Sequence, residues 1–183
     1  MEKSRPSKAR LFVALELPEA TRGQAARILP AHRGLRPAAE QTLHVTLAFL
    51  GWTDEGDIGR VGALTGEAVA GRRAVELVPT GVRAVPPRRP RLFALDLEDP
   101  AGAGGELQAA VAGALVEAAL LEPEKRPFWP HVTLARVRRG RVVVPGGGPL
   151  PGAFRADRVV VYRSMLRPDG AVYEPQRSFT LEP

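Results

Sequence analysis

The sequence predicts an α+β protein with a bilobal, duplicated fold: two mainly antiparallel sheets, helices on their outer faces and a central groove. Three observations predict this fold. An apolar segment that ends at proline occurs twice, a helical pattern follows each copy, and a tetrapeptide that begins with histidine recurs letter for letter. We expect one domain over residues 1–183, made of pseudo-repeat halves at about 10–85 and 91–181.

Each half begins with an apolar strand, at residues 10–18 and 91–100, and extended pairing should stop at the proline that ends it. Helices are expected next, at about 19–30 and 103–120. In the second helix four apolar residues recur at helical spacing and form one face: Leu107, Val111, Leu115 and Ala118.

The remaining segments read as a connection, a loop and a closing hairpin. Residues 84–90 are rich in proline and arginine and should join the two halves. Residues 146–149 are glycine-rich and should form a loop. Strands are expected at 153–164 and 171–181, joined by a turn at 167–170.

The composition is that of an ordinary globular protein, with 44% hydrophobic and 25% charged residues. No apolar run approaches the roughly 18–20 residues that span a bilayer, and the first residues lack the pattern of a secretory signal. The absence of cysteine excludes disulfides, thiolate nucleophiles and sulfur-based zinc sites. We therefore expect a cytoplasmic protein without membrane contact.

The chain carries a formal net charge of +6, and of its 26 basic residues only Lys3, Lys8 and Lys125 are lysines. The planar guanidinium of arginine suits paired contacts to phosphate, so a nucleotide or RNA partner fits this composition. A codon preference for arginine would produce the same excess. Charge alone therefore does not decide the function.

The repeated tetrapeptide is His-Val-Thr-Leu, at residues 44–47 and 131–134. Side chains alternate across a strand, so His44 and Thr46 share one face while the valine and leucine can enter the core. His131 and Thr133 follow the same rule. A single histidine in a strand is usually structural, but here two of the three histidines head the same tetrapeptide.

Two imidazoles that face a common groove can act as an acid–base pair, because their ordinary pKa lies near neutral pH. In-line displacement at phosphorus needs such a pair: one ring takes a proton from water and the other protonates the departing oxygen. The threonine hydroxyls can donate hydrogen bonds to the non-bridging oxygens, and a nearby arginine would stabilise their charge. A bound phosphate would couple the two titrations.

Arg136 lies five residues after His131. Strand alternation turns it away from that histidine unless the strand twists or bulges, so the residues alone leave its role open.

Other chemistries have weaker support in the sequence. Two histidines are an incomplete zinc set, and His32 lies outside any ligand spacing. No Gly-x-Ser-x-Gly or Walker motif is present. Residues 102–105 are glycine-rich and precede a helix, which favours a helix-initiating loop. We expect neither a metal nor a cofactor.

With these motifs the chain resembles the 2H phosphoesterase superfamily, in particular the bacterial RNA 2′,3′-cyclic phosphodiesterases once named 2′-5′ RNA ligases. The resemblance covers nearly the whole chain. It includes residues 10–15, both His-Val-Thr-Leu segments and residues 130–136. It continues to a terminal hairpin with Ser164, Leu166, Gly170 and Tyr173.

The resemblance implies hydrolysis of 2′,3′-cyclic phosphate ends of RNA, tRNA fragments among them, to 2′-phosphates, without metal or cofactor. His44 would then be the proton donor to the leaving 3′-oxygen, and His131 the proton acceptor that activates water. Thr46 and Thr133 would be phosphate ligands, and Arg136 would contact the substrate phosphate. The reverse reaction would weakly join RNA ends through a 2′-5′ bond.

Two aromatic residues keep alternative interpretations. Phe12 matches an aromatic position of the family near the groove, where it would stack a base or belong to the core. Members of the family often carry arginine directly before the Pro-His of the second motif, whereas this chain has Trp129. Trp129 would stack a base or cover the sheet edge, and we favour the covering role.

Two other functions remain open. The chain could be an RNA-binding module with a degenerate site that uses arginines such as Arg88, Arg89, Arg138, Arg139 and Arg141. It could instead hydrolyse a small cyclic phosphate, such as ADP-ribose 1″,2″-cyclic phosphate. In each case we expect a monomer.

Overall fold

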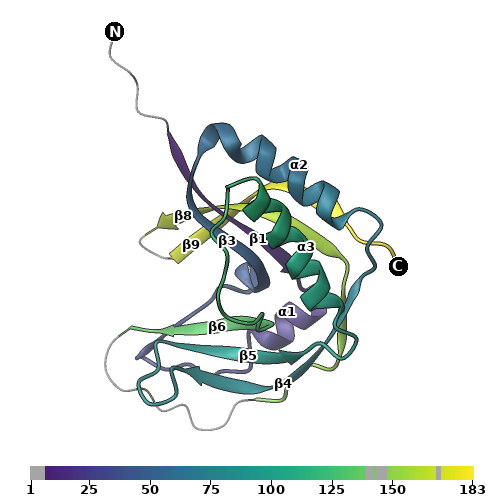
Figure 1. Ribbon diagram of the computed structural model, residues 1–183. Coiled ribbons are helices and arrows are strands. Elements are labelled where there is room, and N and C mark those ends of the chain that lie inside the picture. Colours follow the sequence, from purple (N-terminus) through teal and green to yellow (C-terminus); the bar gives the residue numbers. More distant parts are fainter. Residues whose placement is uncertain (1–6, 139–141, 143–147, 168–169) are drawn as a thin grey trace.

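The computed structural model describes residues 7–138, 142, 148–167 and 170–183 (Figure 1). Its strands form a curled sheet in the order β7-β4-β5-β6-β3-β1-β8-β9, with β2 beside β6. The strands are β1 (Lys8–Glu16), β2 (Leu35–Pro37), β3 (His44–Asp54), β4 (Val75–Val85), β5 (Leu92–Glu98), β6 (His131–Val137), β7 (Phe154–Ala156), β8 (Arg158–Arg167) and β9 (Gly170–Thr180).

The helices are α1 (Glu19–Ala25), α2 (Ile58–Val69) and α3 (Ala103–Glu117), with short 3₁₀ turns η1 (Glu40–Thr42) and η2 (Glu55–Asp57). Helices α2 and α3 lie side by side and pack against the sheet (Figure 1). All pairings between the named strands are antiparallel, so the expected α+β class with mainly antiparallel strands is confirmed.

The strands fall into two lobes, one with β1, β3, β8 and β9 and the other with β2 and β4–β7. A single residue pair, Val45 with Val132, joins β3 to β6 between them. The two expected sheets are therefore linked into one continuous sheet.

The lobes exchange strands between the sequence halves. Strand β4 belongs to the first half but pairs with β5 of the second, and β8 of the second half pairs with β1 of the first. Each lobe thus contains strands from both parts of the chain. A repeat in the sequence indicates that two segments are similar, but it does not say which strands they pair with.

One hydrophobic core underlies both lobes and the two long helices. Strand β1 contributes Leu11, Val13 and Leu15 at alternate positions, all at most 1% exposed. Helix α3 contributes Leu107, Val111 and Leu115, which confirms three of the four residues of its expected apolar face; Ala118, the fourth, follows the end of the helix and is only partly buried. Because the apolar face of β1 and the apolar face of α3 are both buried in this core, the polar side chains of the sheet lie on its opposite face.

Both expected helices are shorter than the sequence pattern suggested. The first ends at Ala25, where hydrogen bonds between residues three apart, Arg27 N–H to Gln24 O and Ile28 N–H to Ala25 O, replace the α-helical pattern. Helix α3 ends at Glu117, and Ala119 adopts a left-handed conformation with φ 57°, as residues that follow helices often do.

Several elements were not predicted, including β2, α2 and β4. Strand β4 extends to Val85, into the segment 84–90 that we expected to be only a connection. The closing hairpin is present as β8 and β9, but the single strand expected at 153–164 is divided at Asp157 into β7, which pairs with β4, and β8. Its turn residues 168–169, and residues 146–147 of the expected glycine loop, lie outside the described residues. Among those described, no helix has the length and apolar character needed to cross a membrane.

Leu95 of β5 is fully buried in the shared core, so shortening it should leave a cavity. We expect Leu95→Ala to lower the free energy of unfolding by about 2–5 kcal/mol, measured by urea denaturation. Leu150→Ala is the matched control, because Leu150 is 39% exposed and should change stability little. Equal stability of the two variants would contradict the placement of this core.

Candidate active site

The two His-Val-Thr segments meet at the junction of the lobes. Since Val45 pairs with Val132 in an antiparallel ladder, the register places His44 opposite Thr133 and Thr46 opposite His131. Both valines are at most 1% exposed, so the histidines and threonines occupy the other face of the sheet. His44 and His131 are then diagonal neighbours, which in an ordinary antiparallel pair lie roughly 7–8 Å apart.

Each histidine ring is held by the same hydrogen bond. His44 Nδ1 lies 2.7 Å from the carbonyl oxygen of Thr42, and His131 Nδ1 lies 2.8 Å from that of Trp129. A carbonyl oxygen only accepts, so Nδ1 carries the proton in both rings and Nε2 is left for chemistry. The Nε2 atom of His44 lies 3.1 Å from Thr46 Oγ1.

Aromatic side chains support the ring of His44. The centroid of Phe12 lies 4.8 Å from that of His44, and Tyr173 approaches the same imidazole edge-on at 5.4 Å. Phe12 is 3% exposed and also stacks on Tyr162 at 5.3 Å. Phe12 therefore packs as a core residue beneath the histidine and has little free ring surface.

A different group supports His131. The indole of Trp129 stacks on the imidazole, with ring centroids 3.9 Å apart and planes 13° from parallel. Its Nε1–H donates to Asp96 Oδ1 at 2.9 Å, and Arg83 Nε donates to Asp96 Oδ2 at 2.7 Å. Trp129 thus covers one face of the proposed proton acceptor, a contact that neither interpretation of its sequence position included.

Matching β-bulges follow the two threonines. Leu47 has no partner between the pairs of Thr46 with Ala14 and Ala48 with Val13, and Leu134 is likewise passed over between β6 and β5. Each bulge inserts one extra residue into its strand, so the side chains after it point to the opposite face from the one that strict alternation predicts. Arg136, the fifth residue after His131, therefore lines the same cavity as Thr133.

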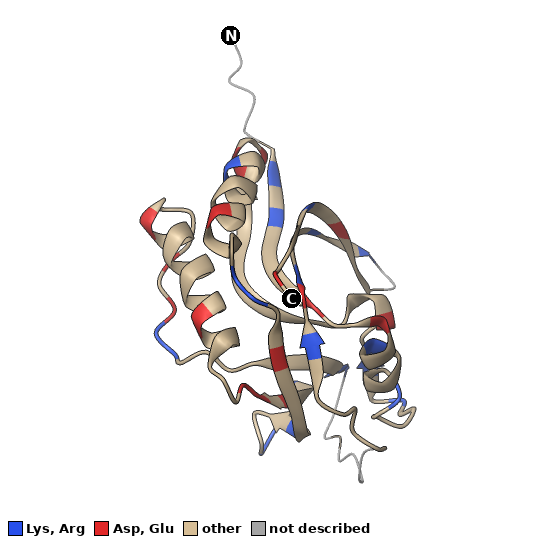
Figure 2. Cartoon of the chain, turned by 90° about the vertical axis from the view of Figure 1, so that its right-hand side faces the viewer, with Lys and Arg blue, Asp and Glu red and all other residues tan. Residues whose placement is uncertain are grey.

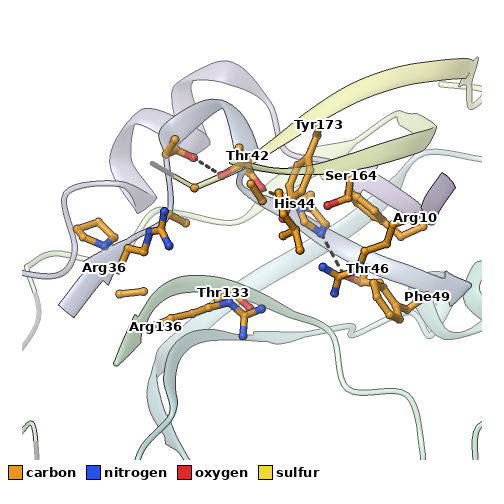
Figure 3. A pocket seen from close by; sticks show the side chains of 18 residues that line it. Arg10, Arg36, Thr42, His44, Thr46, Phe49, Thr133, Arg136, Ser164 and Tyr173 are labelled. Atoms are coloured by element: carbon orange, nitrogen blue, oxygen red, sulfur yellow. Dashed lines mark hydrogen bonds between the residues drawn. The ribbon is translucent and has the colours of Figure 1, made fainter. Parts of the chain in front are cut away.

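A cavity of about 550 Å³ opens over this face of the sheet (Figure 3). The side chains of His44, Thr46 and Thr133 line it, and the guanidinium groups of Arg10 and Arg136 extend toward the space between them (Figure 3). Its remaining walls are formed by Phe12, Arg36, Pro37, Ala38, Ala39, Thr42, Phe49, Ala135, Ser164, Leu166, Gly170, Ala171 and Tyr173.

The cavity has the charge of an anion site. Three arginines line it, Arg10, Arg36 and Arg136, and none of the described lining residues carries a carboxylate. Arg36 lies directly opposite Arg136 in the pairing of β2 with β6, an arrangement of like charges that a bound anion would stabilise. Guanidinium groups bind phosphate oxygens in paired hydrogen bonds.

The structure thus brings five of the seven residues predicted from the sequence onto one cavity wall: Phe12, His44, Thr46, Thr133 and Arg136. His131 and Trp129 do not line that wall and lie beside it, at the start of β6 and just before it. The charge of His131 nevertheless reaches His44, because it adds to the lowering of the His44 pKa that burial causes.

Sequence reasoning did not assign roles to Arg10, Arg36, Arg83 or Asp96. Arg36 and Asp96 reach the site through pairing with β6, opposite Arg136 and His131. Such long-range pairing leaves no local signal in the sequence.

Burial lowers the pKa of both histidines below the ordinary value of 6.5. For His44 the carbonyl of Thr42 opposes this shift, and the charge of His131 adds to it. For His131 the Trp129 carbonyl and the Asp96 carboxylate oppose it, while Arg83 adds to it. Both rings are therefore neutral at neutral pH until an anion binds, and an anion would raise both pKa values.

No group of three or more His, Asp or Glu side chains that could hold a metal ion occurs within the described ranges. His32, the third histidine, is exposed, and its Nδ1 accepts a hydrogen bond from the backbone N–H of Gly34 at 3.0 Å.

The lowered pKa values can be measured directly. In an NMR titration of the free protein, we expect the imidazole resonances of His44 and His131 to titrate below pH 6.5, because burial disfavours their charged forms. Saturating inorganic phosphate should raise both midpoints. Midpoints at or above 6.5 in the free protein, or midpoints that phosphate leaves unchanged, would contradict the described electrostatics.

Known proteins are similar to this chain in both sequence and architecture. Residues 16–164 match the family model described as the 2′-5′ RNA ligase superfamily. The chain is 29% identical to the RNA 2′,3′-cyclic phosphodiesterase of Methanothermobacter thermautotrophicus, over 95% of this chain and all of the relative.

Solved structures agree with this match. A crystal structure of Escherichia coli LigT complexed with 3′-AMP superposes with a TM-score of 0.78 at 26% identity, covering 96% of this chain and 99% of LigT. A protein of Thermus thermophilus superposes with the same score at 30% identity, covering 94% of this chain and 97% of that one. The resemblance noted in the sequence is confirmed, and the chain belongs to the 2′-5′ RNA ligase superfamily.

Proposed function

We propose that this protein hydrolyses 2′,3′-cyclic phosphate ends of RNA to 2′-phosphates, with His44 as general acid and His131 as general base. The observation that carries the proposal is the register at Val45 and Val132, which gathers both histidines and both threonines on one face beside an arginine-lined cavity. The names of the relatives, RNA 2′,3′-cyclic phosphodiesterases, support the same reaction.

In the proposed reaction a water molecule attacks phosphorus in line with the bond to the 3′-oxygen. Nε2 of His131 takes the proton of the attacking water, and Nε2–H of His44 gives a proton to the departing 3′-oxygen. The P–O3′ bond breaks, so the product carries a 3′-hydroxyl and a 2′-phosphate. The two histidines exchange protonation states in one turnover and return to their starting states through solvent.

Charge on the phosphate oxygens is stabilised from two sides. Thr46 and Thr133 donate hydrogen bonds from their hydroxyls, and Arg136 supplies a cation that the bulge in β6 turns toward the cavity. Arg10 and Arg36 add positive charge around the same space. No step requires a metal ion or a cofactor.

The substrate itself supplies the charge that the general acid needs. Burial keeps His44 neutral in the empty site, yet it must carry a proton to act as an acid. The cyclic phosphate is an anion, so its binding favours the protonated form of His44. Substrate binding and proton uptake are therefore linked, which favours charged phosphodiesters over neutral esters.

Several finer statements stay predictions from the sequence. They are the use of tRNA fragments as natural substrates, weak 2′-5′ joining as the reverse reaction, a monomeric state and a cytoplasmic location. A small cyclic phosphate such as ADP-ribose 1″,2″-cyclic phosphate would fit the same chemistry, whereas a non-catalytic RNA-binding module has no need for two titratable rings.

Phosphorus NMR of a 2′,3′-cyclic nucleotide tests activity and regiochemistry together. We expect the wild-type protein to yield a 2′-phosphate in the presence of a chelator. His44→Ala and His131→Ala should each lower kcat by about 10²- to 10⁴-fold while circular dichroism remains unchanged, because each removes one proton transfer. A folded variant that retains most activity would remove that histidine from the mechanism, and a 3′-phosphate product would exclude the assigned roles.

The pH profile provides an independent test. The free enzyme that can react has His44 protonated and His131 neutral, and both pKa values lie below 6.5. We therefore expect kcat/KM for a cyclic nucleotide to be bell-shaped, with its maximum below pH 6.5, since this parameter reports ionisations of the free enzyme. A maximum clearly above that value would contradict the assignment of these two groups.

A further inference from the structure

Three polar side chains lie in a row across the strands of one lobe. Asp96 of β5 pairs with His131 of β6 on one side and with Gly81 of β4 on the other. Residues paired across strands share a face, and Arg83, two residues after Gly81, points to that face as well. Arg83, Asp96 and His131 therefore all lie on the face of the sheet that carries the proposed proton acceptor.

Trp129 connects His131 to the other members of this row. Its carbonyl oxygen accepts the hydrogen bond from Nδ1–H of His131, and its indole covers one face of the imidazole. The indole N–H in turn donates to Oδ1 of Asp96, and Arg83 donates to Oδ2. Both oxygens of the carboxylate are thus engaged, and the direction of the indole is fixed from the neighbouring strand.

The charge of Asp96 is partly shielded from water. Its side chain is 17% exposed, against 57% for that of Arg83, so solvent screens the carboxylate less than it would at an open surface. The charged groups that face His131 are Asp96 on β5, Arg83 on β4 and His44 on β3. Asp96 raises the pKa of His131 and Arg83 lowers it, so both partners of this ion pair act on the ring.

The other histidine has no equivalent support. The carboxylate opposite His44 in the pairing of β1 with β3 belongs to Glu16. That carboxylate accepts a hydrogen bond from the hydroxyl of Tyr162 and pairs with Arg158, and the His44 ring packs against Phe12 instead. An indole held by a carboxylate is therefore particular to the histidine to which we assign the role of base.

We propose that Asp96 and Trp129 are positioning residues for the general base. Asp96 fixes the indole of Trp129, and Trp129 holds the ring of His131 with its Nε2 directed at the attacking water. When His131 takes the proton, the carboxylate and the π face of the indole both stabilise the imidazolium that forms. Arg83 holds the carboxylate in place and limits its effect on the ring.

This inference rests on the proposed function and deepens it, because it explains how one copy of a duplicated motif becomes the proton acceptor. A base that is oriented by a further group is a general feature of acid–base sites. The alternative is that Trp129 only covers the sheet edge. Any large apolar side chain could do that, so the two roles predict different behaviour of the same variants.

Kinetics with a 2′,3′-cyclic mononucleotide separates positioning from covering. We expect Trp129→Leu to lower kcat by about 10- to 100-fold with KM changed by less than about two-fold, because a misdirected base affects the transition state rather than substrate binding. Trp129→Phe keeps a ring on the imidazole but loses the N–H, so its kcat should lie between those of Trp129→Leu and wild type. Trp52→Leu is the matched control, because Trp52 is 65% exposed and does not line the cavity.

An NMR titration of the His131 imidazole in the free protein tests the electrostatics and needs no activity. Asp96→Asn keeps an acceptor for the indole N–H but removes the charge, so the midpoint of His131 should fall. Arg83→Gln removes a cation and should raise the same midpoint. Asp54→Asn and Lys8→Gln make the same charge changes in an exposed ion pair at the start of β1, where Figure 2 shows basic positions, and should leave it unchanged.

Wild-type kcat in either Trp129 variant would overturn the inference, and so would a His131 midpoint that neither Asp96→Asn nor Arg83→Gln moves. If circular dichroism shows that Trp129→Leu does not fold, the more conservative Trp129→Phe and Asp96→Asn decide the question. If the wild-type protein hydrolyses no cyclic nucleotide, the proposed function fails by itself. The titrations then still test the row: opposite shifts in the Asp96 and Arg83 variants support it, and unchanged midpoints overturn it.

Discussion

The backbone pair of Val45 with Val132 is the constraint on which the rest of the site depends. It is the one named pairing between β3 and β6 among the described residues, and both valines are buried in the common core. A one-residue slip in register would turn every side chain of a strand to the opposite face. Burial of these two valines therefore fixes both histidines and both threonines on the open face.

Duplication gives the site its symmetry, and divergence gives its two halves different chemistry. Each histidine donates from Nδ1 to the carbonyl two residues before it, but His44 is packed by Phe12 and Tyr173 while His131 is stacked by Trp129. Asp96 and Arg83 act on the pKa of His131 only. Two copies of one motif can thus perform the opposite proton transfers that we propose.

The same divergence applies to the positions after the bulges. The fifth residue after each histidine faces the cavity, and it is Phe49 in one copy and Arg136 in the other. A guanidinium suits the phosphate, and an exposed aromatic ring suits a base. In the proposed reaction Arg136 contacts the substrate phosphate from one lobe, while Phe49 lines the same cavity from the other.

Local patterns in the sequence predicted much of this arrangement. Strand alternation placed each histidine with its threonine, and helical spacing identified the buried face of α3. The direction of Arg136 could not be predicted, because a bulge at Leu134 reverses the alternation. Asp96 was missed because it reaches His131 only through the pairing of β5 with β6. The repeats in the sequence likewise did not reveal that β4 of the first half pairs with β5 of the second, or that β8 of the second half pairs with β1 of the first.

The most direct test of the central claim is a crystal structure of this protein with a 3′-nucleotide bound. The account predicts one phosphate group held between the two rings, with Nε2 of His44 and Nε2 of His131 each about 2.7–3.2 Å from one of its oxygens. A phosphate that contacts only one of the two imidazoles, with the other turned away from the cavity, would contradict it.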